Sequence, residues 1–96
     1  MNRLTLISSR KYPLQSLVEG ALENELRILE AGIRRTKKNI ETFEEKYAMA
    51  SDEFIQRFEN DELEETIELI EWIGEYRLLQ RLQQKADTLR EIEFAS

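Results

Sequence analysis

The chain has 96 residues, which is room for one domain with one hydrophobic core and excludes a multidomain enzyme. Three Gly and one Pro are too few for a turn-rich β-sandwich or barrel, whereas the 35% of charged residues, mostly Glu, Arg and Lys, favours helices. Histidine and cysteine are absent, which removes histidine acid–base chemistry, thiol nucleophiles, disulfides and the ordinary zinc and iron–sulfur sites. The composition predicts an all-α interaction protein that has no metal or cofactor and is not an enzyme.

Charge is unevenly distributed along the chain, whose net charge is −6. Residues 1–40 carry eight bases and four acids, whereas residues 41–96 carry six bases and sixteen acids. This asymmetry indicates electrostatic complementarity, either between the two halves or toward a partner. The acidic excess argues against general nucleic-acid binding, because neutralising phosphates needs a dominant basic face.

No apolar run approaches the roughly 20 residues that a membrane-spanning helix needs. The first nine residues have a short apolar patch (Leu4, Leu6 and Ile7) but lack the h-region of a secretory signal. The absence of cysteine fits a reducing compartment. We therefore expect a cytoplasmic protein with no membrane partner.

Residues 1–12 form an arm whose apolar and polar residues partly alternate, which predicts either a short strand or a frayed terminus. Its charged residues, Arg3, Arg10 and Lys11, are all basic. These three side chains are candidates for a weak, local contact with nucleic acid.

A first long helix is predicted over residues 13–48, with Pro13 in its first turn. Its apolar residues are spaced alternately four and three apart, the heptad pattern of a helix that buries one stripe. This stripe comprises Leu22, Leu26, Leu29, Ile33, Thr36, Ile40, Phe43 and Tyr47, with Thr36 as its only polar member. Such a helix needs a neighbour to cover its stripe.

A short helix is predicted over residues 52–59 with Ser51 as its N-cap, followed by a third helix over residues 62–93 that Asn60 or Asp61 would cap. The third helix begins with the stripe Leu63, Ile67, Ile70 and Gly74 and then shifts through Trp72, Tyr76 and Leu79 to Leu82, Ala86 and Leu89. A shift of this kind indicates a buried face that rotates along the helix and contacts two surfaces.

Two long helices joined by a short one predict an antiparallel helical hairpin over residues 13–96. Its core, or the interface of its dimer, is expected from Leu22, Leu26, Leu29, Ile33, Ile40, Phe43, Ile67, Ile70, Leu79, Leu82 and Leu89. The hairpin would place the basic residues 34–38 beside the acidic residues 59–75, which could neutralise each other. Because a two-helix core is thin, we expect a homodimer or larger assembly that resembles a four-helix bundle.

A ladder of carboxylates on the third helix is the strongest candidate for chemistry, because acids three or four apart share a face and can hold a divalent cation. The ladder comprises Glu64, Glu65, Glu68, Glu71 and Glu75. All-helical nucleotide pyrophosphohydrolases pair a Glu-x-x-Glu motif with a downstream Glu-x-x-Asp. Here Glu68 and Glu71 supply the first motif, but Gln84 stands three residues before Asp87. A solvated acidic face is the simpler interpretation.

The same face is the candidate surface for a basic partner protein. Its expected contact residues are Glu64, Glu68, Glu71, Trp72, Glu75 and Tyr76. Trp72 and Tyr76 are one turn apart, and such aromatics either anchor an interface or form a core layer. Small residues within the helices, such as Gly32 and Gly74, indicate close approach of a second helix.

The segment Phe43–Phe54 (FEEKYAMASDEF), then Phe58 and the segment Leu69–Tyr76 (LIEWIGEY), resembles a group of small uncharacterised prokaryotic helical proteins. That group is similar to antitoxin-like partners encoded beside small toxin-like genes. The similarity covers residues 13–94, rests on capping and packing features, and implies no catalytic residue. Ala48 stands where the group more often has Gly, which argues against a left-handed helix cap at this position.

The sequence thus favours a protein–protein interaction module, in its most specific form an antitoxin-like protein that binds a basic partner. A self-associating structural bundle without an external ligand is the main alternative. DNA binding through the basic arm, and a metal-dependent nucleotide hydrolase, are further alternatives.

Overall fold

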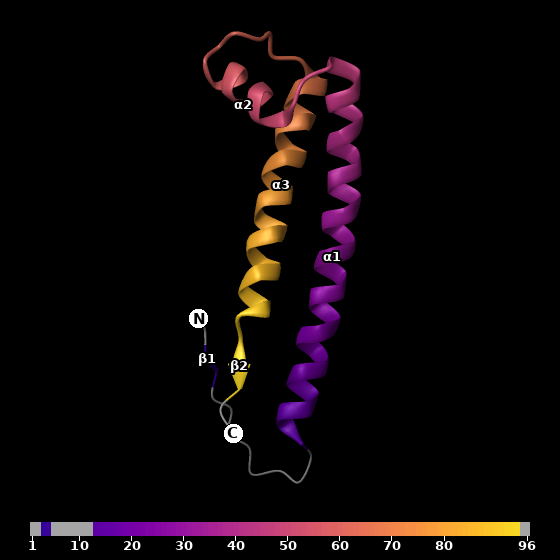
Figure 1. The fold of residues 1–96 in the computed structure, drawn as a ribbon, viewed down its shortest axis with the longest axis vertical. Coiled ribbons are helices and arrows are strands. Elements are labelled where there is room, and N and C mark those ends of the chain that lie inside the picture. The colour runs from indigo at the N-terminus through magenta and orange to yellow at the C-terminus, as the bar shows by residue number, and fades with distance from the viewer. Residues whose placement is uncertain (1–2, 5–12, 95–96) are drawn as a thin grey trace.

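The computed structural model describes residues 3–4 and 13–94. Helices α1 (Leu14–Tyr47) and α3 (Ile67–Arg90) lie side by side and antiparallel, and the short helix α2 (Ser51–Glu59) connects them at one end (Figure 1). At the other end, strand β1 (Arg3–Leu4) pairs in parallel with strand β2 (Glu93–Phe94), with Arg3 opposite Glu93. The molecule measures 60 × 22 × 18 Å. The predicted all-helical hairpin is confirmed, whereas dimerisation stays a prediction.

Helix α3 is shorter than predicted at both ends, since it spans residues 67–90 and not 62–93. Thr66 caps it: the Thr66 hydroxyl accepts a hydrogen bond of 3.2 Å from the Leu69 backbone N–H. The prediction that Asn60 or Asp61 caps this helix is therefore wrong. Residues 62–66 form an extended connection, so Glu64 lies outside the helix.

Two left-handed residues end α1 and reverse the chain after α2. Ala48 has φ 49° and ψ 46°, so the expectation from the sequence that it avoids this conformation is wrong. Asp61, with φ 55°, closes the turn after α2, where the Glu62 N–H donates to the Arg57 carbonyl at 2.9 Å. Asp tolerates the left-handed region better than Ala does, because its side chain can bond locally.

Helix α2 begins one residue earlier than predicted, with Ala50 as its N-cap in place of Ser51. The Ser51 backbone N–H donates to the Glu44 carboxylate at 2.7 Å, which ties the start of α2 to the end of α1. Its hydroxyl is then free to accept a hydrogen bond of 2.9 Å from the Trp72 indole N–H. Ser51 thus joins the core of the hairpin and does not cap a helix.

The best-packed core lies between α2 and the adjoining ends of α1 and α3. Trp72 and Phe54 are fully buried and their rings stack with centroids 3.8 Å apart. Phe43 and Tyr47 of α1 stack against Trp72 at 5.7 and 5.6 Å. The cluster is completed by Leu69 and Ile73, with Met49, Ile55, Phe58 and Leu63 packed around them.

Away from α2 the molecule is only two helices thick. Leu29, Thr36 and Ile40 of α1 and Ala86 of α3 are buried there. The other expected core residues in this part are only half-buried: Leu22, Leu26, Ile33, Leu79, Leu82 and Leu89. At Gly32 the two helices approach closely, since a Cβ there would lie 3.4 Å from a Leu82 methyl group.

Ile67 and Ile70 do not belong to the hairpin core, because they are 79% and 53% exposed; their other expected place, the interface of a dimer, stays a prediction. The buried stripe of α3 is Leu69, Trp72, Ile73, Tyr76, Leu79, Leu82, Ala86 and Leu89. From Leu69 through Trp72 and Tyr76 to Leu79 the spacing is 3, 4 and 3, and from Leu79 through Leu82 and Ala86 to Leu89 it is again 3, 4 and 3. Two intervals of three therefore meet at Leu79, and the buried face rotates there, as the sequence predicted. Leu63, the first member of the stripe expected through Ile67 and Ile70, precedes α3 and packs against the aromatic core.

Candidate protein-interaction surfaces

Trp72 and Tyr76, the two aromatic residues considered as anchors for a partner, lie at the contact between α2 and α3. Trp72 is fully buried, so the expectation that it contacts a partner is wrong and it forms a core layer instead. Tyr76 is half-buried, and its hydroxyl donates to the Asp52 carboxylate at 3.1 Å. This hydrogen bond and partial burial raise the pKa of Tyr76. Both side chains therefore hold α2 against α3.

Two carboxylates of the ladder bond to α1. Glu68 forms an ion pair of 2.6 Å with Lys46, and Glu75 accepts a hydrogen bond of 3.4 Å from Asn39. The hydrogen bond with Lys46 holds the pKa of Glu68 below its usual value and raises the pKa of Lys46. Glu71, which lies between them and is exposed, makes no hydrogen bond or ion pair with any residue that the structure describes.

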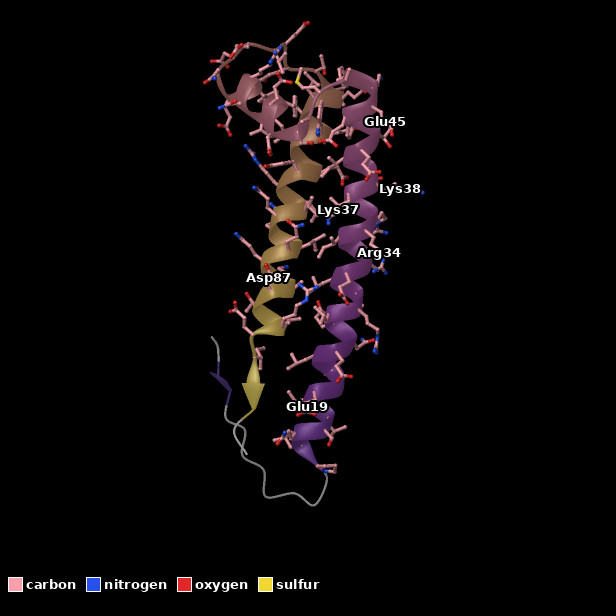
Figure 2. All side chains as sticks on the ribbon, in the orientation of Figure 1. Glu19, Arg34, Lys37, Lys38, Glu45 and Asp87 are labelled. Atoms are coloured by element: carbon pink, nitrogen blue, oxygen red, sulfur yellow. The ribbon has the colours of Figure 1, made fainter. Side chains whose placement is uncertain are left out.

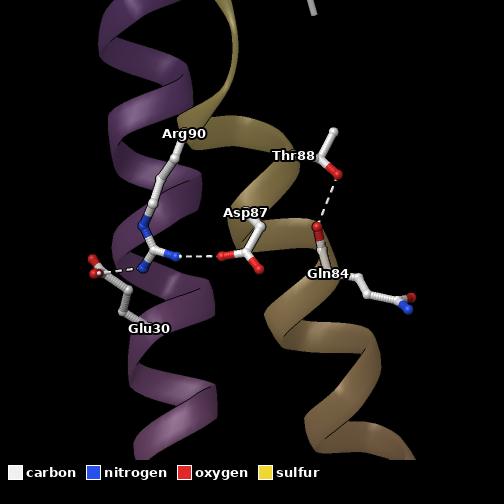
Figure 3. A network of polar contacts seen from close by, with 5 residues as sticks. All are labelled: Glu30, Gln84, Asp87, Thr88 and Arg90. Atoms are coloured by element: carbon white, nitrogen blue, oxygen red, sulfur yellow. Dashed lines mark hydrogen bonds and ion pairs between the residues drawn. The ribbon is translucent and has the colours of Figure 1, made fainter. Parts of the chain in front are cut away.

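The basic cluster at residues 34–38 does not neutralise the acidic stretch in the described part of the chain. Figure 2 shows Arg34 and Lys38 on the side of α1 that points away from α3. A second ion pair between the helices lies at the end of α3, where Arg90 contacts Glu30 in the middle of α1 at 3.2 Å and Asp87 of α3 at 3.0 Å (Figure 3). Both pairs join charged residues that flank the buried stripes of the two helices.

The end of the molecule that carries α2 is strongly acidic. Residues 41–71 contain twelve acids and only two bases, Lys46 and Arg57. Both bases are already paired, Lys46 with Glu68 and Arg57 with Glu53. Exposed carboxylates gather on the end of α2 and on the connection to α3: Glu59, Asp61, Glu62, Glu64 and Glu65. We call these five residues the acidic end.

A shallow groove between α1 and α3 follows one face of the hairpin. Near α2 it is lined by Phe43, Thr66, Ile67 and Glu71, and it continues along Asn39 and Gly74. Farther along, a hollow of about 520 Å³ lies between α1 and α3, with Leu29 and Leu89 beside Arg81 and Lys85. Residues seven or fourteen apart share a face of these helices, as do Ile67 and Arg81, Glu71 and Lys85, and Phe43 and Leu29. These hollows therefore belong to one face, which we call the open face.

The sequence did not single out Arg81, Lys85 or Leu78 as residues of a site. Their signal is their heptad position: Leu78 and Lys85 follow Glu71 at intervals of seven, and Arg81 follows Gly74. Reading by heptad the positions of α3 that lie opposite Leu69 and Tyr76 would have found them.

The remaining sequence-based candidates are separate from these surfaces. Arg3 lies in β1, while Arg10 and Lys11 lie outside the described residues, so a nucleic-acid contact by the arm stays a prediction. Among residues 3–4 and 13–94, no three acidic side chains converge in the way a metal site needs. No helix in this part of the chain combines the length and the apolar character required to cross a membrane.

The chain matches no family model, no curated protein and no solved structure.

Proposed function

We propose that the protein is a non-enzymatic helical interaction module that binds a basic partner protein through its acidic end and also associates with itself. The observation that carries the first part is the concentration of charge: twelve acids against two bases in residues 41–71, at one end of a molecule 60 Å long. Electrostatic complementarity of this kind steers a cationic partner to its site and selects against other partners.

The acidic end differs from the surface expected from the sequence. Glu68 and Glu75 are engaged with α1, and Trp72 is buried, so none of these three is available as the main contact. Glu64 and Glu65 are exposed, lie on the extended connection, and are followed by the exposed Ile70 on the first turns of α3. An apolar side chain beside carboxylates suits a partner that presents basic and apolar side chains together.

Charge reversal at the acidic end tests partner binding. We expect Glu64→Lys combined with Glu65→Lys to abolish copurification of a basic protein from the native host, because the cationic partner then meets like charge. The matched control, Glu19→Lys with Glu23→Lys, makes the same change in net charge at the far end of α1 and should keep the partner.

Circular dichroism and the fluorescence of Trp72, the single tryptophan, report whether both variants fold. Equal capture by the two folded variants would show that the acidic end is not the binding surface.

An antitoxin-like role is the most specific form of the proposal, in which the partner is a toxin-like protein with a basic, nucleic-acid-binding surface. This antitoxin-like role rests on the resemblance of residues 13–94 to the small helical proteins that are similar to antitoxin-like partners.

Self-association is supported by the thin core of the hairpin. Beyond α2, six of the expected core residues are only half-buried, and Ile28 of α1 is 57% exposed. Covering such residues in an assembly stabilises a small helical domain, by about 25 cal/mol for each Å² of apolar surface removed from water. A cytoplasmic location is part of the same proposal and is supported by the absence of cysteine.

A further inference from the structure

We infer that a second copy of this chain packs on the open face, with its α3 antiparallel to the first α3 and a two-fold axis at Leu78. This inference deepens the self-association part of the proposed function and rests on it. It is independent of partner binding, which uses the acidic end.

Charge along the open face is the first argument. On this face α3 carries Glu68, Glu71 and Glu75 in its first half and Arg81 and Lys85 in its second half. Glu71 and Lys85 lie seven residues on either side of Leu78. A two-fold axis at Leu78 therefore sets Glu71 of each copy opposite Lys85 of the other. A parallel arrangement would set acid beside acid and base beside base.

Shape gives a second argument. Ile67 and Leu89 are equally far from Leu78, so the same axis brings Ile67 of one copy to the hollow where Leu29 and Leu89 lie. Ile67 is 79% exposed in the single chain, and in this position it would lose most of its contact with water. Burial of an exposed Ile side chain stabilises an assembly substantially. Ile67 is therefore the side chain that we expect to fill this hollow.

Gly74 provides room for the close approach. A Cβ built at Gly74 meets nothing within 4 Å, so the glycine is not required by the packing of the single hairpin. A glycine inside a helix costs about 1 kcal/mol relative to Ala. In the antiparallel pair, Gly74 of one copy faces the region of Leu82 of the other. Because Gly74 has no side chain, the two α3 helices can approach each other closely there.

The area is sufficient for a stable pair. From Ile67 to Leu89, α3 is about 33 Å long at 1.5 Å per residue. Over the 22 Å width of the molecule, this length gives a footprint of roughly 700 Å² per copy, close to the ~800 Å² of a standard interface.

Cross-linking of single-cysteine variants tests the register, because the natural chain has no cysteine. With a short bis-maleimide, Leu78→Cys should form a covalent dimer, since the two thiols meet at the axis. Glu71→Cys alone should remain monomeric, because its partner's thiol is about 21 Å away along the helix. A mixture of Glu71→Cys and Lys85→Cys should form a mixed dimer. Glu45→Cys, on the side of α1 that points away from α3 (Figure 2), is the control.

The outcomes separate the register from self-association itself. Efficient cross-linking of Glu71→Cys alone would show a parallel pair and overturn the inference. If sedimentation finds a dimer but neither Leu78→Cys nor the mixture cross-links, the dimer does not form through the open face, and only the proposal of self-association remains. A chain that sediments as a monomer at all concentrations contradicts both. The Glu71 and Lys85 variants change exposed residues, so they remain informative if Leu78→Cys fails to fold.

Charge exchange gives an independent measure of the same contact. Glu71→Lys or Lys85→Glu alone should raise the dimer Kd roughly tenfold, since each reversal acts twice across the axis. The double variant should return the Kd close to that of the natural chain. Glu45→Lys and Lys38→Glu, which lie off the open face, should leave it unchanged; equal effects from these controls would contradict the proposed register.

Discussion

At the scale of single residues, the structure places Ala48 in a conformation that suits glycine. Its φ of 49° lies in the left-handed region, which costs a residue with a Cβ about 1–2 kcal/mol. The left-handed conformation arises because only three residues connect the end of α1 at Tyr47 to the start of α2 at Ser51, so the chain must turn sharply. The short turn then allows Glu44 to bond the Ser51 backbone.

Ala48→Gly is therefore expected to stabilise the protein, by about 0.5–1 kcal/mol after the greater flexibility of glycine in the unfolded chain is subtracted. The urea midpoint of the variant measures the change. Ala31→Gly, within α1 and exposed, is the control and should destabilise by about 1 kcal/mol. Destabilisation by both substitutions would show that Ala48 is not left-handed in solution.

At the scale of elements, the ion pair of Lys46 and Glu68 joins the end of α1 to the start of α3. The pKa of Glu68 is lowered by this contact, so the pair stabilises the fold at neutral pH and loses its effect as the pH falls through that pKa. The pKa of Lys46 is raised, so the contribution is also lost in strong alkali, when Lys46 deprotonates.

We expect Glu68→Gln to lower the melting temperature at pH 7 by a small amount, and the difference from the natural protein to shrink below the ordinary carboxyl pKa and to vanish below the lowered pKa of Glu68. Glu45→Gln, the same change at an exposed position of α1 that lies off the open face, has no such pair among the described residues and should leave the melting temperature unaltered. A Glu68→Gln effect that persists at acidic pH would mean that it arises from packing and not from charge.

The elements also show what the sequence could predict. The seam of α1 is an unbroken heptad pattern, so its length and buried side followed from spacing alone. Helix α3 has two apolar stripes, and spacing alone could not decide between them, because the choice depends on Trp72 filling the space under α2. Thr66 is a recognisable N-cap residue for α3 in the sequence. However, Leu63 and the acidic residues before Thr66 have the pattern of a helical turn, so the sequence alone predicts an earlier start.

The candidate surfaces were predicted less well than the fold. The acidic character of one end was visible in the sequence, yet the pairing of Glu68 with Lys46 and of Glu75 with Asn39 depends on the register between α1 and α3. A single chain does not fix that register by pattern, since a shift of one heptad preserves both stripes. Spacing also could not choose between an interface anchor and a core layer for Trp72, because its burial depends on how α2 folds over it.

At the scale of the whole molecule, packing and charge divide the hairpin into two parts. The end with α2 has a closed aromatic core and a strong negative charge, whereas the rest has half-buried Leu and Ile and most of the bases. A two-helix segment with few buried residues opens more readily than a packed core. A second copy on the open face would cover that weaker segment and match its charge.

Sedimentation equilibrium of the full chain tests this account most directly. The account predicts a mass twice the 11.5 kDa of one chain at micromolar concentration, with dissociation promoted by high salt because opposite charges meet across the interface. A single 11.5 kDa species over the whole concentration range, at both low and high salt, would contradict it.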